Sequence, residues 1–224
     1  MRIACALQPS HLSYYQLTLE PGTVFHSRPP PLPDDEAAWQ IQTEGQRLLA
    51  QAGYRQYEVS AYAREGYRCR HNLNYWQFGD YLGIGAGAHG KCTRRLDRQL
   101  LIERSTRPRE PRRYLAANSV EGIAATGVSV PAAELPFEYL LNALRLNDGF
   151  EQPDFEARTG IELSSIADPL ALAQRRGLLL RRGTHWRASE LGFNFLNDLL
   201  ALFLPATVAV TSATGVAATQ PGAG

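Results

Sequence analysis

Six consecutive residues combine a metal-ligating side chain with aromatic rings. They are His71-Asn72-Leu73-Asn74-Tyr75-Trp76. A neutral imidazole is an axial ligand for heme iron, and the rings of Tyr75 and Trp76 offer flat apolar surface to a porphyrin. From the spacing alone a capped turn with buried rings is the stronger interpretation, because His-Asn beside Tyr-Trp suits that role as well.

A glycine-rich segment follows at once. Gly85-Ala86-Gly87-Ala88-His89-Gly90 matches the G-x-G-x-x-G pattern of dinucleotide-binding turns. Such a turn requires an amphipathic helix directly after the glycines, whereas residues 91–98 are polar and basic. We therefore expect these glycines to let the backbone approach a ligand closely, without a dinucleotide fold.

The elements that position these segments begin with a strand, a helix and a second strand. Residues 12–19 are an apolar and aromatic run that predicts a buried strand, closed by Glu20-Pro21-Gly22. Asp34 is expected to cap a helix that Gly53 ends. Strand character returns at residues 57–62. This order predicts the βαβ unit of a parallel sheet.

Flanking segments extend this picture. Residues 2–7 resemble the end of a preceding helix, and a parallel sheet with so few strands leaves edges exposed, so we expect the chain to start within a domain. A short strand is expected at residues 100–103 and a short helical piece around Tyr114. Residues 116–133 are rich in small side chains and predict a hinge.

A second unit is expected after this hinge. The apolar pattern predicts helices at 137–146, from Asp154 to Thr159-Gly160, and at 165–176, then a hairpin at 178–187. A closing helix is expected at 191–204, with Phe195, Leu199 and either Leu202 or Phe203 inward. Helices, a hairpin and a helix in this order are typical of a winged helix.

Charge and cysteine content restrict the class of protein. Net charge is +1, but residues 55–113 hold 13 basic and 6 acidic side chains, so this third attracts anionic ligands such as tetrapyrrole propionates, or nucleic acid. Cys5, Cys69 and Cys92 lack the spacing of a metal knuckle or a disulfide framework. No secretion signal opens the chain, and a reducing, cytoplasmic setting fits best.

Two further alternatives concern the C-terminal third. Residues 199–218 are long enough to span a bilayer, but Pro205 and several threonines argue against it, and residues 206–224 are expected to be a disordered tail. Arginines between Arg175 and Arg187 would suit DNA backbone contact in a winged helix. Acidic residues dominate this third, so a solvated face is the preferred interpretation.

Several motifs together resemble one family. HNLNYW, YEVSAYA at 57–63 and FGDYLGIGAGAHG at 78–90 are similar to the HemW-type heme chaperones, which are radical S-adenosylmethionine relatives of oxygen-independent coproporphyrinogen III oxidase. The similarity runs from about residue 7 to residue 204, and the HNxxYW motif favours the chaperone branch. That family's CxxxCxxC cluster motif is absent from this sequence.

The resemblance implies an α/β fold in two parts. Residues 1–115 are expected to be the C-terminal part of a partial (β/α) TIM-like barrel, and residues 116–133 a hinge. Residues 134–205 are expected to form a mostly helical, winged-helix-like domain, followed by the tail at 206–224.

The resemblance also implies the site residues. His71 is expected to ligate heme iron, while Asn72, Tyr75 and Trp76 shape the heme pocket. Gln16, Thr18 and His89 fall where the family contacts S-adenosylmethionine. No catalytic residue is assigned, because a 4Fe-4S cluster needs thiolates that the scattered cysteines do not supply, so this chain alone is not expected to be an enzyme.

The resulting expectation is a cytoplasmic heme chaperone that carries heme rather than turning it over. Expected partners are heme and a heme acceptor of the cytochrome or respiratory type; a homodimer and peripheral membrane contact are left open, and nucleic acid is not expected. The alternatives are a coproporphyrinogen III oxidase-like oxidoreductase of porphyrin biosynthesis and a winged-helix nucleic-acid-binding module.

Overall fold

The structure, a computed structural model, describes residues 1–97, 99–116 and 126–205. The chain is a mixture of helices and short antiparallel sheets, and it divides into two compact units, Met1–Leu73 and Asn74–Gly224. Each unit is described by itself below. The predicted α/β class is therefore present, whereas the boundary between units lies earlier than the predicted hinge at 116–133.

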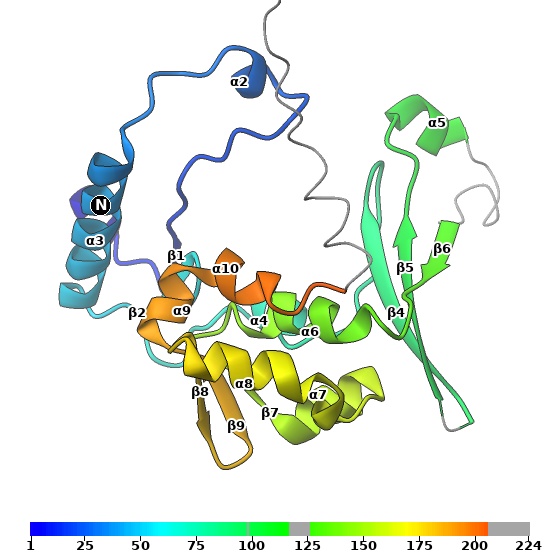
Figure 1. The fold of residues 1–224 in the computed structure, drawn as a ribbon. Coiled ribbons are helices and arrows are strands. Elements are labelled where there is room, and N and C mark those ends of the chain that lie inside the picture. The colour runs from blue at the N-terminus through cyan, green and yellow to red at the C-terminus, as the bar shows by residue number, and fades with distance from the viewer. Residues whose placement is uncertain (98, 117–125, 206–224) are drawn as a thin grey trace, which may run out of the picture. The chain divides into compact units, whose positions relative to one another are not determined.

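The first unit is built around one long helix (Figure 1). Its elements are α1 (Arg2–Ala6), β1 (His11–Ser13), α2 (Val24–Ser27), α3 (Asp35–Gln51), β2 (Arg55–Glu58) and β3 (Ala61–Ala63), and α4 (Arg70–Trp76) begins in it. As predicted, the Asp34 side chain caps α3, accepting a hydrogen bond from the Ala37 amide at 2.8 Å. Gly53, with φ of +84°, follows the helix end.

The sheet of the first unit differs from the predicted parallel βαβ unit. Its order is β1-β3-β2, and β3 pairs antiparallel with both neighbours. The predicted strand at 57–62 is in fact a tight hairpin, in which the chain reverses between Glu58 and Ala61. β1 and β2 do run in the same direction, but β3 lies between them and supplies the hydrogen bonds that the prediction assigned to a direct parallel pair.

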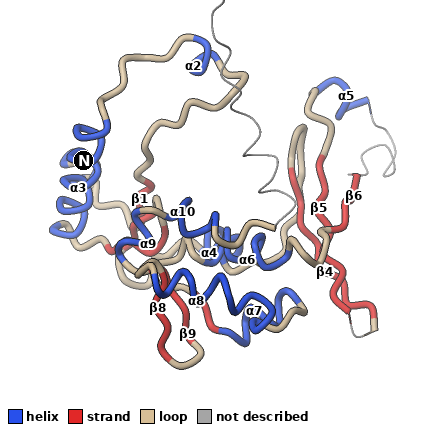
Figure 2. The backbone as a smooth tube through the Cα atoms, in the orientation of Figure 1, coloured by secondary structure: helices blue, strands red, loops and turns tan. Residues whose placement is uncertain are grey.

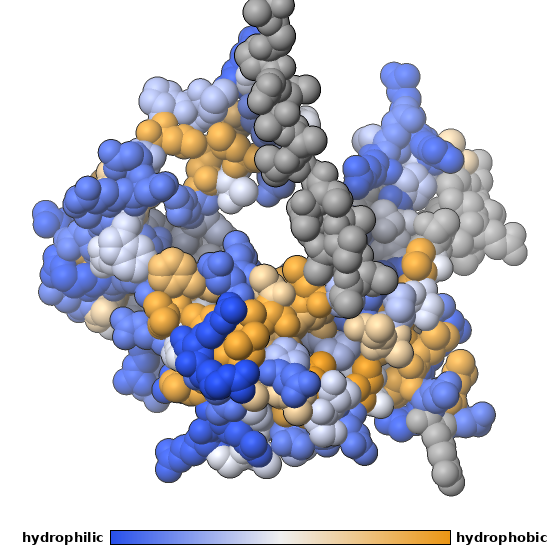
Figure 3. All heavy atoms as spheres, viewed as in Figure 1, coloured by the Kyte–Doolittle hydropathy of each residue, from blue (hydrophilic) through white to orange (hydrophobic). Residues whose placement is uncertain are grey.

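The predicted strand at 12–19 is also wrong for most of its length. Only His11–Ser13 forms a strand, and residues 14–20 have no regular structure, as Figure 2 shows in tan. Tyr15 is 69% exposed and Leu17 is 47% exposed. An apolar run becomes a strand only where a neighbouring strand offers free hydrogen-bonding groups, and β3 ends after three residues. Apolar side chains also reach the surface around α2 (Figure 3).

The second unit begins with a long antiparallel hairpin. β4 (His89–Leu96) pairs with β5 (Gln99–Thr106) from His89 opposite Thr106 to Leu96 opposite Gln99. β6 (Thr126–Ser129) adds a third strand beside β5, and α5 (Pro111–Ala116) lies between them in sequence. The strand expected at 100–103 and the helical piece around Tyr114 are present. Residues 126–129 lay in the predicted hinge, but they pair with β5 and so are part of a sheet; residues 117–125 lie outside the described part.

The remainder of the second unit follows the predicted order of helices, hairpin and helix. Its elements are α6 (Leu135–Ala143), β7 (Phe150–Glu151), α7 (Gln152–Thr159), η1 (Leu163–Ile166), α8 (Ala167–Arg175), β8 (Leu179–Arg182), β9 (His185–Ala188), α9 (Glu190–Asn194) and α10 (Leu196–Ala201). The sheet order is β7-β9-β8, so the unpredicted β7 adds a third strand to the predicted hairpin.

A single core holds these elements together. Tyr139, Phe150 and Phe155 meet edge to face at its centre, with Tyr139 5.4 Å from Phe150 and 5.1 Å from Phe155 between ring centroids. Leu199 and Phe203 point inward as predicted, but Phe195 is 55% exposed. The expected single helix breaks at Phe195, which separates α9 from α10 and turns its ring outward.

Of the alternative membrane span at 199–218, the structure describes residues 199–205, where α10 ends at Ala201. Across residues 1–97, 99–116 and 126–205, none of the helices is long and apolar enough to cross a membrane. Residues 206–218, and the predicted tail at 206–224, lie outside the described residues.

Candidate functional site

The HNLNYW segment forms a helix, α4, rather than the capped turn that its spacing suggested. Residues three or four positions apart share one face of a helix, so His71 and Tyr75 leave the same face of α4. His71 is exposed, while Asn72, Leu73, Tyr75 and Trp76 are half-buried. The residue of this helix that could ligate a metal therefore lies at the surface.

The Tyr57 hydroxyl holds the first half of α4 within the first unit. It accepts hydrogen bonds from Asn72 Nδ2 at 3.1 Å and from the Cys69 amide at 3.4 Å, and it lies 2.9 Å from His11 Nε2. Leu73 packs against the group of Tyr57, Ala61 and Ala63. Asn72 thus stabilises the position of the helix through its side-chain amide.

The second half of α4 belongs to the second unit. Asn74 Nδ2 donates to the Asp80 carbonyl at 2.9 Å, and the ring of Tyr75 lies 4.4 Å from that of Tyr81 between centroids. The Arg145 guanidinium lies 4.2 Å over the Trp76 ring. The Trp76 indole nitrogen is buried without a hydrogen-bond partner in the described structure. One face of the Trp76 ring is therefore covered by Arg145.

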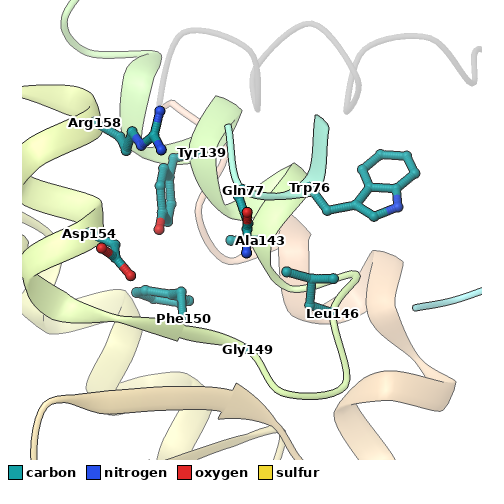
Figure 4. Close-up of a pocket in the computed structure, with 9 residues that line it drawn as sticks. All are labelled: Trp76, Gln77, Tyr139, Ala143, Leu146, Gly149, Phe150, Asp154 and Arg158. Carbon is teal, nitrogen blue, oxygen red and sulfur yellow. The ribbon is translucent and has the colours of Figure 1, made fainter. Parts of the chain in front are cut away.

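Trp76 also borders a small cavity of about 190 Å³ in the second unit (Figure 4). Its lining comes from the end of α4, from α6, and from β7 and α7 with the turn before β7. The lining residues are Trp76, Gln77, Tyr139, Ala143, Leu146, Gly149, Phe150, Asp154 and Arg158. Burial, and to a smaller extent the Asp154 carboxylate, raise the pKa of the Tyr139 hydroxyl. The volume lies below the roughly 300–1,000 Å³ of typical cofactor pockets, so this cavity does not enclose a porphyrin.

An ion pair with one buried partner lies beside the end of α4. Lys91, on β4, is 3% exposed, and its Nζ donates to Asp80 Oδ1 at 2.8 Å. Burial lowers the pKa of the Lys91 ammonium, against the opposing effect of Asp80. Burial opposes ionisation of Asp80, but hydrogen bonds from Lys91 and Thr93 together hold the pKa of this carboxyl below its usual value.

Sequence reasoning missed the roles of Tyr57, Arg145 and Lys91. The partners of Tyr57 and Arg145 are distant in sequence, and no local pattern marks them. Lys91 did carry a signal, since it is the only lysine of the chain.

The glycine-rich segment makes close backbone contacts within the second unit. A Cβ at Gly83 would lie 2.4 Å from the His89 carbonyl oxygen, so only glycine fits where these two backbones meet. Tyr81 and Lys91 exchange backbone hydrogen bonds at 3.0 and 2.9 Å. The glycines lead into strand β4 and not into a helix, which supports the rejection of a dinucleotide turn. Gly83, just before the segment, thus serves an approach of backbone to backbone, and the approach of the glycines at 85–90 to a ligand stays a prediction.

The residues predicted to contact S-adenosylmethionine are divided between the units. Gln16 and Thr18 are exposed on the irregular segment after β1 in the first unit. His89 is exposed at the start of β4 in the second unit, with its Nδ1 3.3 Å from Thr106 Oγ1. These positions stay a prediction.

The cysteines do not fit a 4Fe-4S cluster. Cys5 lies beside Leu49 and Tyr54, Cys69 lies in the separate group around Tyr57, and Cys92 is exposed on β4. Within the described ranges, no three His, Cys, Asp or Glu side chains converge in a manner that could hold a metal ion. A cluster needs several thiolates at one place, so no step through such a cluster is derived for this chain.

Comparison with known proteins gives consistent matches. A family model described as the HemN C-terminal domain matches residues 130–195. The heme chaperone HemW of Escherichia coli (strain K12) is 48% identical over 204 residues, covering 91% of this chain and 52% of that protein. The heme chaperone HemW of Haemophilus influenzae is 43% identical, covering 91% of this chain and 51% of that protein.

The fold is similar to that of a solved structure. Coproporphyrinogen III oxidase (HemN) from Escherichia coli, described as a radical SAM enzyme, matches with a TM-score of 0.66 at 16% identity, over 92% of this chain and 50% of that one. At this identity the likeness concerns the fold alone. The chain spans about half the length of the curated relatives it matches.

Proposed function

Because the chain belongs to the HemW-type family, over about half the length of its relatives, we propose that it contributes the heme-binding part of a heme chaperone. The observation that carries this proposal is the exposed imidazole of His71 on the same face of one helix as the ring of Tyr75. An axial nitrogen ligand beside an aromatic surface is a combination that suits heme.

Each residue of the motif has a proposed part in this site. His71 coordinates the heme iron, and Tyr75 and Trp76 contact the macrocycle. Asn72 acts through Tyr57, because the hydrogen bond that its side-chain amide donates to that hydroxyl fixes the helix that carries His71. Arginines of the basic segment 55–113 pair with the two propionates, since guanidinium groups bind carboxylates in a bidentate manner.

Heme is cargo in this proposal. The chain's own residues bind and orient it until an acceptor protein of the cytochrome or respiratory type takes it. Coproporphyrinogen oxidation is not proposed, because the likeness to the oxidase structure concerns fold alone. The nucleic-acid alternative is not proposed, because acidic residues outnumber basic ones in residues 114–224. Arg181 of the β8–β9 hairpin lies 5.0 Å over the Trp186 ring and donates to the Gly183 carbonyl.

Titration with hemin, followed by absorbance, tests the proposal. We expect wild-type protein to shift the Soret band and His71→Ala to bind at least about tenfold more weakly, which corresponds to about 1.4 kcal/mol. His26→Ala is the matched control, because His26 is also exposed but lies on α2. Identical spectra and affinities for wild type and His71→Ala would remove His71 from its proposed role.

The assignment of Gln16, Thr18 and His89 to S-adenosylmethionine is a separate proposal that applies to the full-length family. A calorimetric titration of S-adenosylmethionine into a full-length homologue carrying alanine at the position equivalent to His89 tests it. Weaker binding is expected, with an unchanged hemin titration. Unchanged binding of S-adenosylmethionine would contradict the assignment.

The finer domain architecture is also proposed rather than established. Residues 1–115 are assigned to the end of a partial (β/α) barrel and residues 134–205 to a winged-helix-like domain. The order of elements from α6 to α10 supports the second assignment. A cytoplasmic location is proposed from the three free cysteines.

A further inference from the structure

Lys91 is an unusual residue for its position. It is the only lysine of the chain, and it is 3% exposed on strand β4. Lysine is almost never fully buried unless its charge is paired, because an ammonium loses its hydration on burial. A specific set of partners must therefore hold it there.

Each of the three ammonium donors has a partner. Nζ donates to the Phe78 carbonyl at 3.0 Å, to Asp80 Oδ1 at 2.8 Å and to Thr93 Oγ1 at 3.1 Å. It also lies 4.2 Å from the centroid of the Phe78 ring. Asp80 is fixed in turn, because its Oδ2 accepts from the Thr93 amide at 2.8 Å.

Two of these partners belong to the segment that ends α4. The Phe78 amide donates to the Tyr75 carbonyl at 3.0 Å and the Gly79 amide donates to the Asn74 carbonyl at 2.7 Å. Phe78 has a φ of +59°, a left-handed conformation that costs energy in a bulky residue. The Lys91 bond to the Phe78 carbonyl and the buried Phe78 ring offset this cost. The ammonium thus holds the residues that close the helix.

The backbone of Lys91 is connected to the ring of Tyr75 through Tyr81. Its amide and carbonyl pair with Tyr81, whose ring lies against that of Tyr75. Arg104 Nη1 donates to the Tyr81 hydroxyl at 2.9 Å and so helps to fix this ring. The end of α4 and the contact surface of Tyr75 therefore both depend on the same short stretch of β4.

We infer that Lys91 is a positioning residue for the proposed heme site: without touching the porphyrin, it fixes the end of α4 and the ring of Tyr75. The inference rests on the proposed heme-binding function. It predicts that loss of the ammonium changes how heme is bound and not only how stable the protein is.

The test compares Lys91→Met with Thr159→Val in the full chain. Methionine keeps much of the length of the side chain and removes the charge. Thr159 is buried elsewhere in the second unit and donates to the Phe155 carbonyl at 2.7 Å, so its loss is a matched structural perturbation. We expect Lys91→Met to bind hemin about tenfold more weakly with a broadened, shifted Soret band, and Thr159→Val to keep the wild-type spectrum.

A second measurement is independent of heme. Hydrogen exchange of the Phe78 and Gly79 amides is expected to accelerate in Lys91→Met and to stay unchanged in Thr159→Val. If wild type binds no hemin, the proposed function fails while this readout still tests the positioning role. Unchanged protection of both amides in Lys91→Met, or a wild-type spectrum and affinity, overturns the inference.

Should Lys91→Met fail to fold, Asp80→Asn is the milder variant. It keeps one side-chain oxygen for Nζ but removes the negative charge and one acceptor for Thr93. Hemin binding and amide exchange are expected to change in the same direction as in Lys91→Met, but by a smaller amount. Wild-type values for both in a folded Asp80→Asn protein, together with a Lys91→Met protein that cannot fold, would reduce Lys91 to a residue of general stability and overturn the inference.

Discussion

The two units differ in how they bury their apolar side chains. The second unit has one continuous core that joins helices α6 to α10 and all three strands β7, β8 and β9. The first unit has two small separate groups, one around Leu49 and one around Tyr57. The difference indicates that packing dominates the stability of the second unit, whereas individual hydrogen bonds carry a larger share in the first.

The largest effect is expected from the centre of the second core. Phe155 is fully buried, so Phe155→Ala should lower the free energy of unfolding of this unit by about 3–5 kcal/mol through lost burial and the cavity left behind. Urea denaturation measures it. Phe195→Ala, at a half-exposed ring, is the control and should cost far less; equal losses would contradict a single dominant core.

A smaller loss of stability is expected from a substitution at the centre of the Tyr57 group in the first unit. Tyr57→Phe keeps the ring but leaves Asn72 and the Cys69 amide without their acceptor, which should cost about 1–3 kcal/mol. Hydrogen exchange should show faster opening within residues 1–73 alone. Tyr67→Phe, at an exposed ring, serves as control. Faster exchange throughout α6 and α7 would show that the units are not independent.

Low pH should lower the free energy of unfolding of the second unit, because it protonates Asp80. The pKa of its carboxyl is below the usual 3.8 when folded, so the unfolded chain takes up the proton first as pH falls. Stability from this carboxylate is present above pH 3.8 and is lost as pH falls below it toward the folded pKa. Unfolding midpoints of wild type and Asp80→Asn across this range should converge. A constant difference between the two would rule out this carboxylate as the source.

The smallest effect on stability is expected from His11 in the first unit. It begins at a higher pH than the effect of Asp80. Burial lowers the pKa of its imidazole below 6.5, partly opposed by Glu58, so the unfolded chain again binds protons first as pH falls. The first unit should lose stability as pH falls below 6.5, whereas the Asp80 effect begins only below 3.8. NMR titration of the His11 ring checks the pKa. His11→Gln should lack the loss in this window, and a folded pKa above 6.5 would reverse the sign.

The same contrast explains which elements the sequence could predict. In the second unit, apolar spacing and a terminating glycine mark α7, where Gly160 has a φ of +72°. The turn at Gly183 likewise marks the hairpin. These signals are local. In the first unit, the chain reverses between Glu58 and Ala61 without a glycine or proline that would indicate a turn in the sequence. Residues 14–19 could form a strand only beside a neighbouring strand from elsewhere in the chain, and local sequence does not show whether one is present.

The candidate site was predicted in part for a similar reason. The residue types of HNLNYW marked the segment, but its helical form follows from contacts with Tyr57 and with the segment around Asp80. Such contacts join residues that local spacing does not relate. The pairing of Lys91 with Asp80 spans a loop of glycines, and polar alternation along β4 alone does not distinguish a buried ammonium from an exposed one.

The burial of the only lysine has a practical consequence for handling this protein. Reagents that acylate lysine amines find no exposed target among its side chains, because Lys91 lies in the interior and the remaining basic side chains are arginine and histidine. Amine-directed crosslinkers and dyes would leave the arginines of the basic segment 55–113 unmodified. Attachment of a probe should instead use the thiol of Cys92, which is exposed on β4 one residue beyond the buried amine.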